Sequence, residues 1–394
     1  MKILLVIDQF DDANNGTTIS TQRFAQTLRS HGNEVRVVST GAPGPEKYQV
    51  RELPLVPIAR GIIKKQGMSF AIPDKQALAE ALAWADVAHF LMPFWLGVQG
   101  VKLAEAMGVP HTAAFHVQPE NITYTLGMGK WSGLNDSLYR LFYRKFYRHF
   151  THIHCPSRFI AGELSRMGYT ARLHVISNGV DPCFTYRRLP KPAAYQDRFL
   201  ILMIGRLSNE KRQDVLMEAV RRSRYADRIQ LVLAGRGPKQ RRYEEIGSSL
   251  PHPPVMAFYG KEDLCDLIAC CDLYVHAADA EIEAISCIEA FSTGLVPVIS
   301  DSPKSATHQF ALDERSRFAA GDCDDLARKI DYWIEHDEER EEMGRKYGEY
   351  GRQFQIDACV SQIEDMFRQA IREQSAVGHT AESDAAESDA GVSA

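Results

Sequence analysis

Two acidic residues, Glu281 and Glu289, lie eight positions apart in the stretch HAADAEIEAISCIEAFSTGLVPVIS, residues 276–300. If one helix carried both, eight steps would separate them by about 12 Å and turn them by roughly 80°. They therefore cannot form the close carboxylate pair of a retaining glycosidase, whose groups are about 5 Å apart. They can contact two ends of one elongated ligand, and free N–H groups at a helix start between them suit a diphosphate. A nucleotide sugar has this layout.

The residues around the pair predict a strand, a loop, a short helix and a second strand. An apolar run precedes the acidic loop, and we expect a helix from Ala284 to Thr293. Gly294 closes that helix, since glycine is common just after the last helical turn. The residues expected at the helix start, beside the diphosphate, are Glu283, Ala284 and Ile285.

Three further residues are of types that bind anions or sugars. Gly205 and Arg206 follow an apolar strand, 199–204, and Lys211 comes before the next helix, so two cations lie near a phosphate-sized site. His116 follows another predicted strand, 111–115. The carboxyl ends of parallel strands form the ligand crevice of open α/β sheets, so a histidine there is well placed for chemistry.

These motifs resemble those of the retaining glycosyltransferases of family 4, which have the GT-B fold. The carboxylate motif is Glu281 and Glu289, followed by Ala290 and Gly294-x-x-Pro297. The resemblance implies that Glu281 orients the donor sugar and that Glu289 binds the ribose hydroxyls. It further implies that His116 contacts the sugar from the opposite domain, that Gly205, Arg206 and Lys211 clamp the diphosphate, that Gly16 approaches this diphosphate, and that Tyr259 and Gly260 frame the base.

The chain departs from the family pattern at several places, one of them the loop at Gly16, where a double glycine is usual. Ile282–Glu283–Ala284 stands where a Gly-Phe-Gly run is usual, Arg212 where glycine is usual, and Ser177 where proline is usual. Glycine allows close backbone approach to phosphate, whereas Glu283 adds negative charge near it. A non-catalytic nucleotide-sugar-binding protein is therefore a second hypothesis.

The chain of 394 residues is too long for one ordinary core. We expect α/β GT-B architecture, with two Rossmann-like domains facing a central cleft. The expected parts are an acceptor-side domain, a nucleotide-sugar domain, a crossover helix packing on the first domain, and a disordered tail: residues 1–187, 198–354, 355–374 and 375–394. Tail residues 381–385 and 386–390 repeat AESDA and lack apolar mass.

Charge is unevenly distributed. Residues 1–195 contain 22 Lys and Arg against 14 Asp and Glu, whereas the remainder contains 24 against 37. Within the basic half, residues 139–150 repeat YRLF, YRKF and YRHF. Cations beside aromatic rings suit an anionic membrane surface, and an ordinary packed helix is the alternative. The candidate membrane contacts are Arg140, Arg144, Lys145 and Arg148; a second basic segment is 59–72.

Other classes fit less well. No G-x-G-x-x-G follows the first strand, which disfavours a dinucleotide oxidoreductase. Eight scattered cysteines without C-x-x-C pairs predict reduced thiols and no zinc, and no cofactor or metal is expected. No apolar run approaches 18 residues, and MKILLVIDQF reads as a strand rather than a signal peptide. Nucleic-acid motifs are not evident.

The resemblance implies a hexosyltransferase, and the charge pattern predicts an acceptor at a membrane. We expect a UDP-glucose type of donor and a membrane lipid such as diacylglycerol as acceptor, with a cytosolic or polysaccharide-precursor acceptor as the alternative. The expected location is the cytoplasm, peripheral on the inner face of the plasma membrane.

Overall fold

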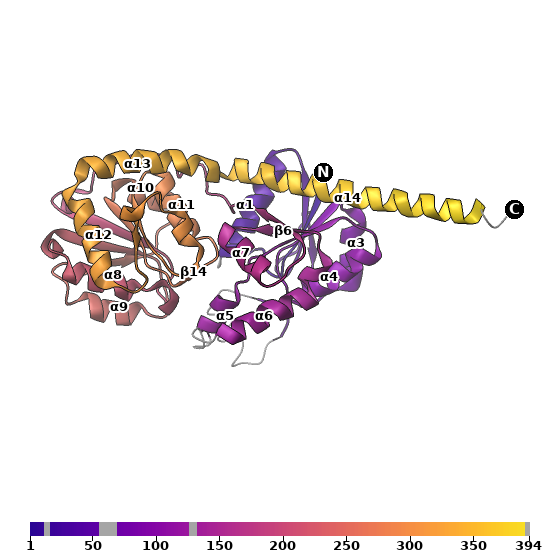
Figure 1. Ribbon diagram of the computed structural model, residues 1–394, viewed down its shortest axis with the longest axis horizontal. Helices are drawn as coiled ribbons and strands as arrows, with labels where there is room; N and C mark the ends of the chain where they lie inside the picture. The colour runs from indigo at the N-terminus through magenta and orange to yellow at the C-terminus, as the bar shows by residue number, and fades with distance from the viewer. Residues whose placement is uncertain (12–15, 55–68, 126–131, 391–394) are drawn as a thin grey trace.

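The computed structural model describes residues 1–11, 16–54, 69–125 and 132–390. It contains two α/β domains side by side, with the last helix lying across the first domain (Figure 1). None of the described helices is both long enough and apolar enough to span a membrane.

The first domain is built on a parallel sheet of seven strands in the order β3-β2-β1-β4-β5-β6-β7. Its first strand, KILLV, is buried in four of five positions, because helices cover both faces of such a sheet. The strand order reverses between β1 and β4, which opens a crevice at the carboxyl ends of the strands. The strands are β1 Lys2–Val6, β2 Glu34–Ser39, β3 Lys47–Gln49, β4 Val87–Phe90, β5 His111–Ala114, β6 His152–Cys155 and β7 Arg172–Val175.

Helices connect these strands within the described part of the domain. They are α1 Gly16–Ser30, α3 Lys75–Trp84, α4 Trp95–Ala106, α5 Pro119–Thr125, α6 Ser132–Lys145 and α7 Arg158–Arg166, with a 3₁₀ turn, η1, at Tyr147–His149. Helix α3 begins where the Asp74 side chain accepts hydrogen bonds from two free backbone N–H groups, an ordinary helix cap.

The second domain repeats this plan with the order β10-β9-β8-β11-β13-β15. Its strands are β8 Phe199–Ile204, β9 Ile229–Ala234, β10 Val255–Ala257, β11 Leu273–His276, β13 Pro297–Ser300 and β15 Arg317–Phe318; β12 Ala280–Glu281 and β14 Lys304–Ser305 pair outside this sheet. Its helices are α8 Gln213–Arg222, α9 Gln240–Gly247, α10 Lys261–Cys270, α11 Ile285–Ser292, α12 Cys323–Glu335 and α13 Asp337–Gly351.

The chain crosses between the domains twice, and the two crossings are hydrogen-bonded to each other. Ile176 packs in the first core and Val180 in the second, so the first crossing comes before the expected boundary at 187. The Val180 N–H donates to the Phe354 carbonyl at 2.8 Å, and the Ile356 N–H donates back to the Val180 carbonyl at 3.0 Å. Gly179 has φ +71°, and a Cβ there would lie 2.9 Å from Ile356 Cα, so only glycine fits.

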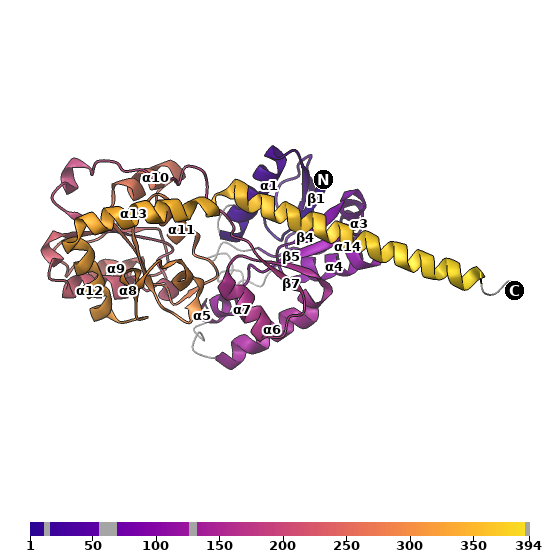
Figure 2. The ribbon, with the colours of Figure 1, turned by 45° about the horizontal axis from the view of Figure 1, so that its top comes forward.

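Helix α14, Ile356–Ala390, leaves the second crossing and runs over the first domain (Figures 1 and 2). Its buried residues join the first core: Ile356, Cys359, Val360, Ile363, Met366 and Phe367. We expected disorder from residue 375, but the helix continues through Ala390. Alanine and glutamate in the AESDA repeats favour helix even where no apolar face exists. Residues 391–394 lie outside the described residues.

Candidate functional site

A cavity of about 250 Å³ lies between the two domains. It brings together several of the predicted site residues: Gly16, His116, Lys211, Glu281, Glu283, Ala284 and Ile285. Thr17, Ser20, Asn178, Ile282 and Ser286 complete its lining. A larger groove, of about 720 Å³, opens beside the starts of β8 and β11 and contains none of the predicted residues.

Glu281, at the end of β12, is held by two cationic or protonatable groups. Its carboxylate accepts a hydrogen bond from the Lys211 ammonium, and its Oε1 lies 3.3 Å from Nε2 of His276. Burial alone would raise the pKa of Glu281, but Lys211 and His276 together hold it at about 2. Glu281 is therefore ionised at neutral pH and can accept hydrogen bonds from hydroxyl groups.

His116 lies two residues after β5 and is only 8% exposed. Among the described residues, nothing hydrogen-bonds to its Nε2. Burial, assisted by His154, lowers the pKa of His116 to about 3. A neutral imidazole carries one donor and one acceptor nitrogen, so His116 can hydrogen-bond to a hydroxyl group without bringing a positive charge.

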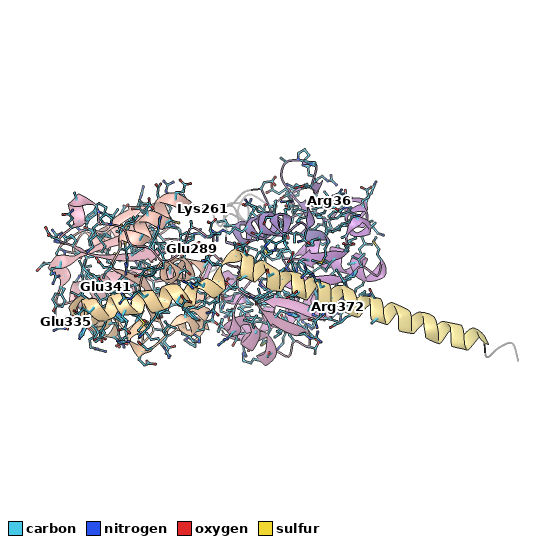
Figure 3. All side chains as sticks on the ribbon, turned by 90° about the horizontal axis from the view of Figure 1, so that it is seen from above. Arg36, Lys261, Glu289, Glu335, Glu341 and Arg372 are labelled. Atoms are coloured by element: carbon cyan, nitrogen blue, oxygen red, sulfur yellow. The ribbon has the colours of Figure 1, made fainter. Side chains whose placement is uncertain are left out.

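Glu289, on α11, faces a different part of the cleft and does not line this cavity. Its Oε1 lies 3.4 Å from Nη2 of Arg23 on α1, so the pair joins the two domains. Figure 3 shows Glu289 near their junction. Burial raises the pKa of Glu289 to about 7, against the lowering effect of Arg23.

Among the described residues, two that are not glycine have a left-handed backbone, and both are positions where glycine is usual in the resembled family. Ala284 has φ +64° at the start of α11, and Arg212 has φ +57° at the start of α8. Such a conformation costs a non-glycine residue about 1–2 kcal/mol. Arg212 gains an ion pair with Asp279 at 3.1 Å, which offsets part of this cost.

Glu283 lines the cavity. The prediction that it adds an unpaired negative charge beside the diphosphate is wrong. Its carboxylate accepts hydrogen bonds from the Ser177 hydroxyl, from the Asn178 backbone N–H at 3.0 Å and from Asn178 Nδ2 at 2.6 Å. Burial raises the pKa of Glu283 to about 7, although these hydrogen bonds lower it. The side chain thus joins the donor loop to the first crossing.

The remaining predicted donor residues lie outside the lining of this cavity. Gly205 follows β8, and a Cβ there would lie 3.5 Å from Cε of Lys211. Arg206 is half-buried, and its carbonyl accepts a hydrogen bond from the Gln213 side chain at 2.9 Å. Gly260 precedes α10, and the half-buried Tyr259 packs against the second core.

The Tyr-Arg-x-Phe repeat does not form one helix. Helix α6 ends at Lys145, and η1 follows, so later members of the repeat leave the helical register. Tyr139 and Tyr147 are fully buried, which corrects our placement of them beside the cations at a surface.

The four cations, Arg140, Arg144, Lys145 and Arg148, are exposed, and none makes an ion pair with a described residue. We call these four the basic ridge. Most of the second basic segment, 59–72, lies outside the described residues.

The sequence reading missed Arg23, His276 and Asn178. Arg23 is seven residues after Gly16 and therefore on the same face of α1, and His276 ends a strand as His116 nearly does. The spacing from Gly16 and the position at a strand end could therefore have identified Arg23 and His276 from the sequence. Over the described ranges, no group of three His, Cys, Asp or Glu side chains could hold a metal ion, and all eight cysteines are free thiols.

Two family models match the chain. "Glycosyltransferase Family 4" matches residues 14–184, and "Glycosyl transferases group 1" matches residues 187–353. Among curated proteins, the GDP-mannose-dependent alpha-mannosyltransferase of Mycolicibacterium smegmatis is 27% identical over 323 residues, which are 76% of this chain and 79% of the relative. Sulfoquinovosyl transferase SQD2 of Arabidopsis thaliana is 23% identical over 356 residues, 87% of this chain and 68% of the relative.

Two solved structures share the two-domain arrangement. HepE of Anabaena, in complex with UDP and glucose, has a TM-score of 0.70 at 16% identity, covering 94% of this chain and 100% of that one. Sucrose-phosphate synthase of Thermosynechococcus elongatus has a TM-score of 0.72 at 15% identity, covering 95% of this chain and 100% of that one. Likeness at this identity concerns the fold.

Proposed function

Because the chain belongs to the family 4 glycosyltransferases and has their GT-B fold, we propose that it is a retaining hexosyltransferase. It moves a hexose from a nucleoside-diphosphate sugar to an acceptor hydroxyl. One observation carries this proposal: the Glu281–Lys211 pair of the second domain and His116 of the first line the same cavity. The second hypothesis, a non-catalytic binding protein, is weakened because the Glu283 carboxylate is hydrogen-bonded to Ser177 and Asn178 rather than left unpaired in the cavity.

The proposed mechanism relies on electrostatics rather than on a protein nucleophile. As the bond from the sugar to the diphosphate breaks, negative charge grows on the leaving oxygen, and the acceptor oxygen bonds to the same carbon. Arg206, Lys211 and the free N–H groups at the start of α11 would stabilise this charge. Glu281 and His116 would hold sugar hydroxyls, and Glu289 would hold the ribose. These cations replace a metal ion, so we expect activity to survive EDTA.

For the donor we favour UDP-glucose. HepE was solved with UDP and glucose, whereas the mycobacterial relative is named for GDP-mannose. A thermal-shift panel of UDP-glucose, UDP-galactose and GDP-mannose distinguishes them, because a ligand that binds only the folded state raises its melting temperature. The largest shift with a GDP-sugar would overturn the UDP assignment.

For the acceptor we favour a membrane lipid such as diacylglycerol, reached from the inner face of the plasma membrane. The support is the exposed basic ridge on the acceptor-side domain, since each cation near an anionic membrane surface contributes about 1 kcal/mol. A cytosolic or polysaccharide-precursor acceptor is the alternative.

The deciding experiment is release of nucleoside diphosphate. We expect the purified protein to release it from the donor only when acceptor is added, and the Glu281→Ala variant to bind donor but release little. The product's anomeric configuration, read by NMR, tests retention. A wild-type protein that binds donor and never releases nucleotide with any acceptor would favour the non-catalytic hypothesis.

A further inference from the structure

Asn178 lies in the first crossing between the domains, and its amide is hydrogen-bonded to Glu283 through the nitrogen. Its Nδ2 donates to Oε2 of Glu283 at 2.6 Å, and its backbone N–H donates to Oε1 of the same carboxyl group at 3.0 Å. The side chain is 5% exposed, and its Oδ1 has no partner among the described residues. Asn178 also lines the interdomain cavity, together with His116 and Glu281.

Glu283 determines which way this amide is turned. In its ionised form, which predominates above the Glu283 pKa of about 7, the carboxylate can only accept hydrogen bonds, so the amide nitrogen faces Glu283 and the carbonyl oxygen faces away. The Ser177 hydroxyl donates to the same carboxylate and accepts from the Gly179 N–H at 3.0 Å, which fixes the arrangement from the other side. Oδ1 is therefore the polar atom of Asn178 that remains for a ligand.

Because Asn178 Oδ1 can only accept hydrogen bonds, it can bind only a part of the donor that carries a hydrogen-bond donor. A carbonyl oxygen accepts hydrogen bonds, and a diphosphate offers only acceptors, so the diphosphate is excluded as its partner. Glu289, assigned to the ribose, is not in the lining of this cavity, whereas Glu281 and His116, assigned to the sugar, are. A buried acceptor without a partner is costly, so a ligand that supplies a donor is favoured there.

We propose that Asn178 is a sugar-specifying residue, whose Oδ1 accepts a hydrogen bond from one hydroxyl of the transferred hexose, and that Glu283 is the positioning residue that orients its amide. The proposal rests on the proposed function and names a determinant of its sugar specificity. The proposal explains why a carboxylate occupies position 283. The Glu283 carboxylate orients Asn178 and so makes the first crossing part of the sugar pocket.

The test compares the parent donor with donors lacking one sugar hydroxyl at a time. For one position, we expect the wild type to lose roughly 5- to 10-fold in kcat/KM, the scale of one hydrogen bond. Asn178→Ala should be slower with the parent donor but should no longer distinguish it from that one deoxy donor. Its discrimination at the other positions should be unchanged, which a general loss of stability would not produce.

A Glu283 variant gives a second measurement if Asn178→Ala does not fold. Glu283→Ala frees the amide and should also lose the discrimination. The matched control is Asp331→Ala. Asp331 is a buried carboxyl on α12 that accepts from the Ser223 hydroxyl at 2.5 Å and the Arg224 N–H at 3.3 Å, as Glu283 accepts from Ser177 and Asn178, and it also pairs with the Arg224 guanidinium at 3.0 Å. Helix α12 lies on the far side of the second domain (Figure 1).

Two failures are distinguishable. If the wild type transfers no hexose from any nucleotide sugar, the proposed function fails. If the wild type transfers hexose, and Asn178→Ala or Glu283→Ala discriminates among deoxy donors as the wild type does, the assignment of Asn178 is overturned. Loss of discrimination in Asp331→Ala would equally overturn it, because the effect would then follow stability.

Discussion

Glu281 and Glu289 belong to one motif but have opposite electrostatic surroundings. We expect Glu281→Ala to lower turnover, because Lys211 keeps that carboxylate ionised at the cavity. We expect Glu289→Ala to weaken donor binding mainly, as a ribose contact would. Loss of one charged hydrogen-bond partner costs about 1.5–3 kcal/mol. Steady-state kcat and KM for the donor measure both effects, and unchanged kinetics in both variants would remove the donor-site assignment.

Lys211 and Arg206 are expected to act on the transition state. Each alanine variant should lower kcat by roughly 100-fold or more, the loss seen when one transition-state hydrogen-bond donor is removed. Single-turnover rates separate this from donor affinity. Arg236, an exposed cation after β9, is a suitable control for loss of one positive charge. Wild-type rates in Lys211→Ala would show that the diphosphate is bound elsewhere.

Ala284 keeps a left-handed backbone without glycine, so its strain should be removable. We expect Ala284→Gly to raise the free energy of unfolding by about 1 kcal/mol, because glycine adopts φ +64° freely but gains entropy when unfolded. Denaturant unfolding measures this. The control is Ala290→Gly in the middle of α11, which should be destabilising instead, since its backbone is helical. A destabilised Ala284→Gly would contradict the strain argument.

The positions of some site residues were predicted correctly from the sequence, and those of others were not. Seven residues predicted from the motifs and the family resemblance, among them Glu281 and His116, line one cavity. The direction of a side chain is not encoded in spacing, so Glu283 was expected near phosphate when it turns to Ser177, 106 positions away. Asn178 was read only as part of a turn, because its role depends on that same contact.

The helix predicted from the Tyr-Arg-x-Phe repeat differs from the structure in its extent. The four-residue repeat at 139–150 drifts around a helix, and a repeat of this period cannot keep tyrosines outside while phenylalanines stay inside. Tyrosines and phenylalanines of the repeat are both buried in the core, among them Tyr139, Phe146 and Tyr147. The arginines and the lysine are exposed, as is Leu141, so the exposed side chains of this repeat are mostly cationic and electrostatics is the main basis for membrane contact.

The basic ridge yields a prediction for that element. We expect wild-type protein to cosediment with anionic vesicles and less with neutral ones, and binding to weaken as salt screens the charges. Changing Arg140, Arg144, Lys145 and Arg148 to Ser should abolish most of this binding. The charge-matched control changes four exposed arginines of the second domain: Arg221, Arg222, Arg224 and Arg228.

Each result of this comparison is informative. If the control variant loses binding as the ridge variant does, net charge rather than the ridge governs attachment. If the wild type ignores anionic vesicles at low salt, the membrane assignment fails and a cytosolic acceptor becomes the better proposal.

The architecture of the whole molecule was predictable because buried parallel strands are continuous apolar runs separated by helices. The GT-B fold expected from the motifs is confirmed. The crossings were not predictable in detail. The bond between Val180 and Phe354 joins segments 174 positions apart, and nothing local in either segment specifies it.

Buried titratable groups of both kinds should give the molecule opposing pH responses. Burial raises the pKa of Asp8, Glu283 and Glu289 to about 7, so the stability each contributes is complete below about pH 4 and is lost as pH rises through 7. Burial lowers the pKa of His116 to about 3 and of His154 to about 4, so their contribution is present above pH 6.5 and is lost as pH falls. The two trends oppose each other between pH 4.5 and 6.5.

Asp8→Asn should separate these trends. Asp8 Oδ1 accepts the Ala71 N–H at 2.9 Å, a bond that asparagine can keep, and Oδ2 has no partner among the described residues. The variant cannot ionise, so its melting temperature relative to wild type should rise from pH 5 to about pH 7 and then level off. His154→Gln should show the reverse, gaining relative to wild type as pH falls from 6.5 to 4. Exposed Glu262→Gln is the control and should follow wild type. A difference between Asp8→Asn and wild type that stays constant with pH would mean that Asp8 is already ionised in the folded protein.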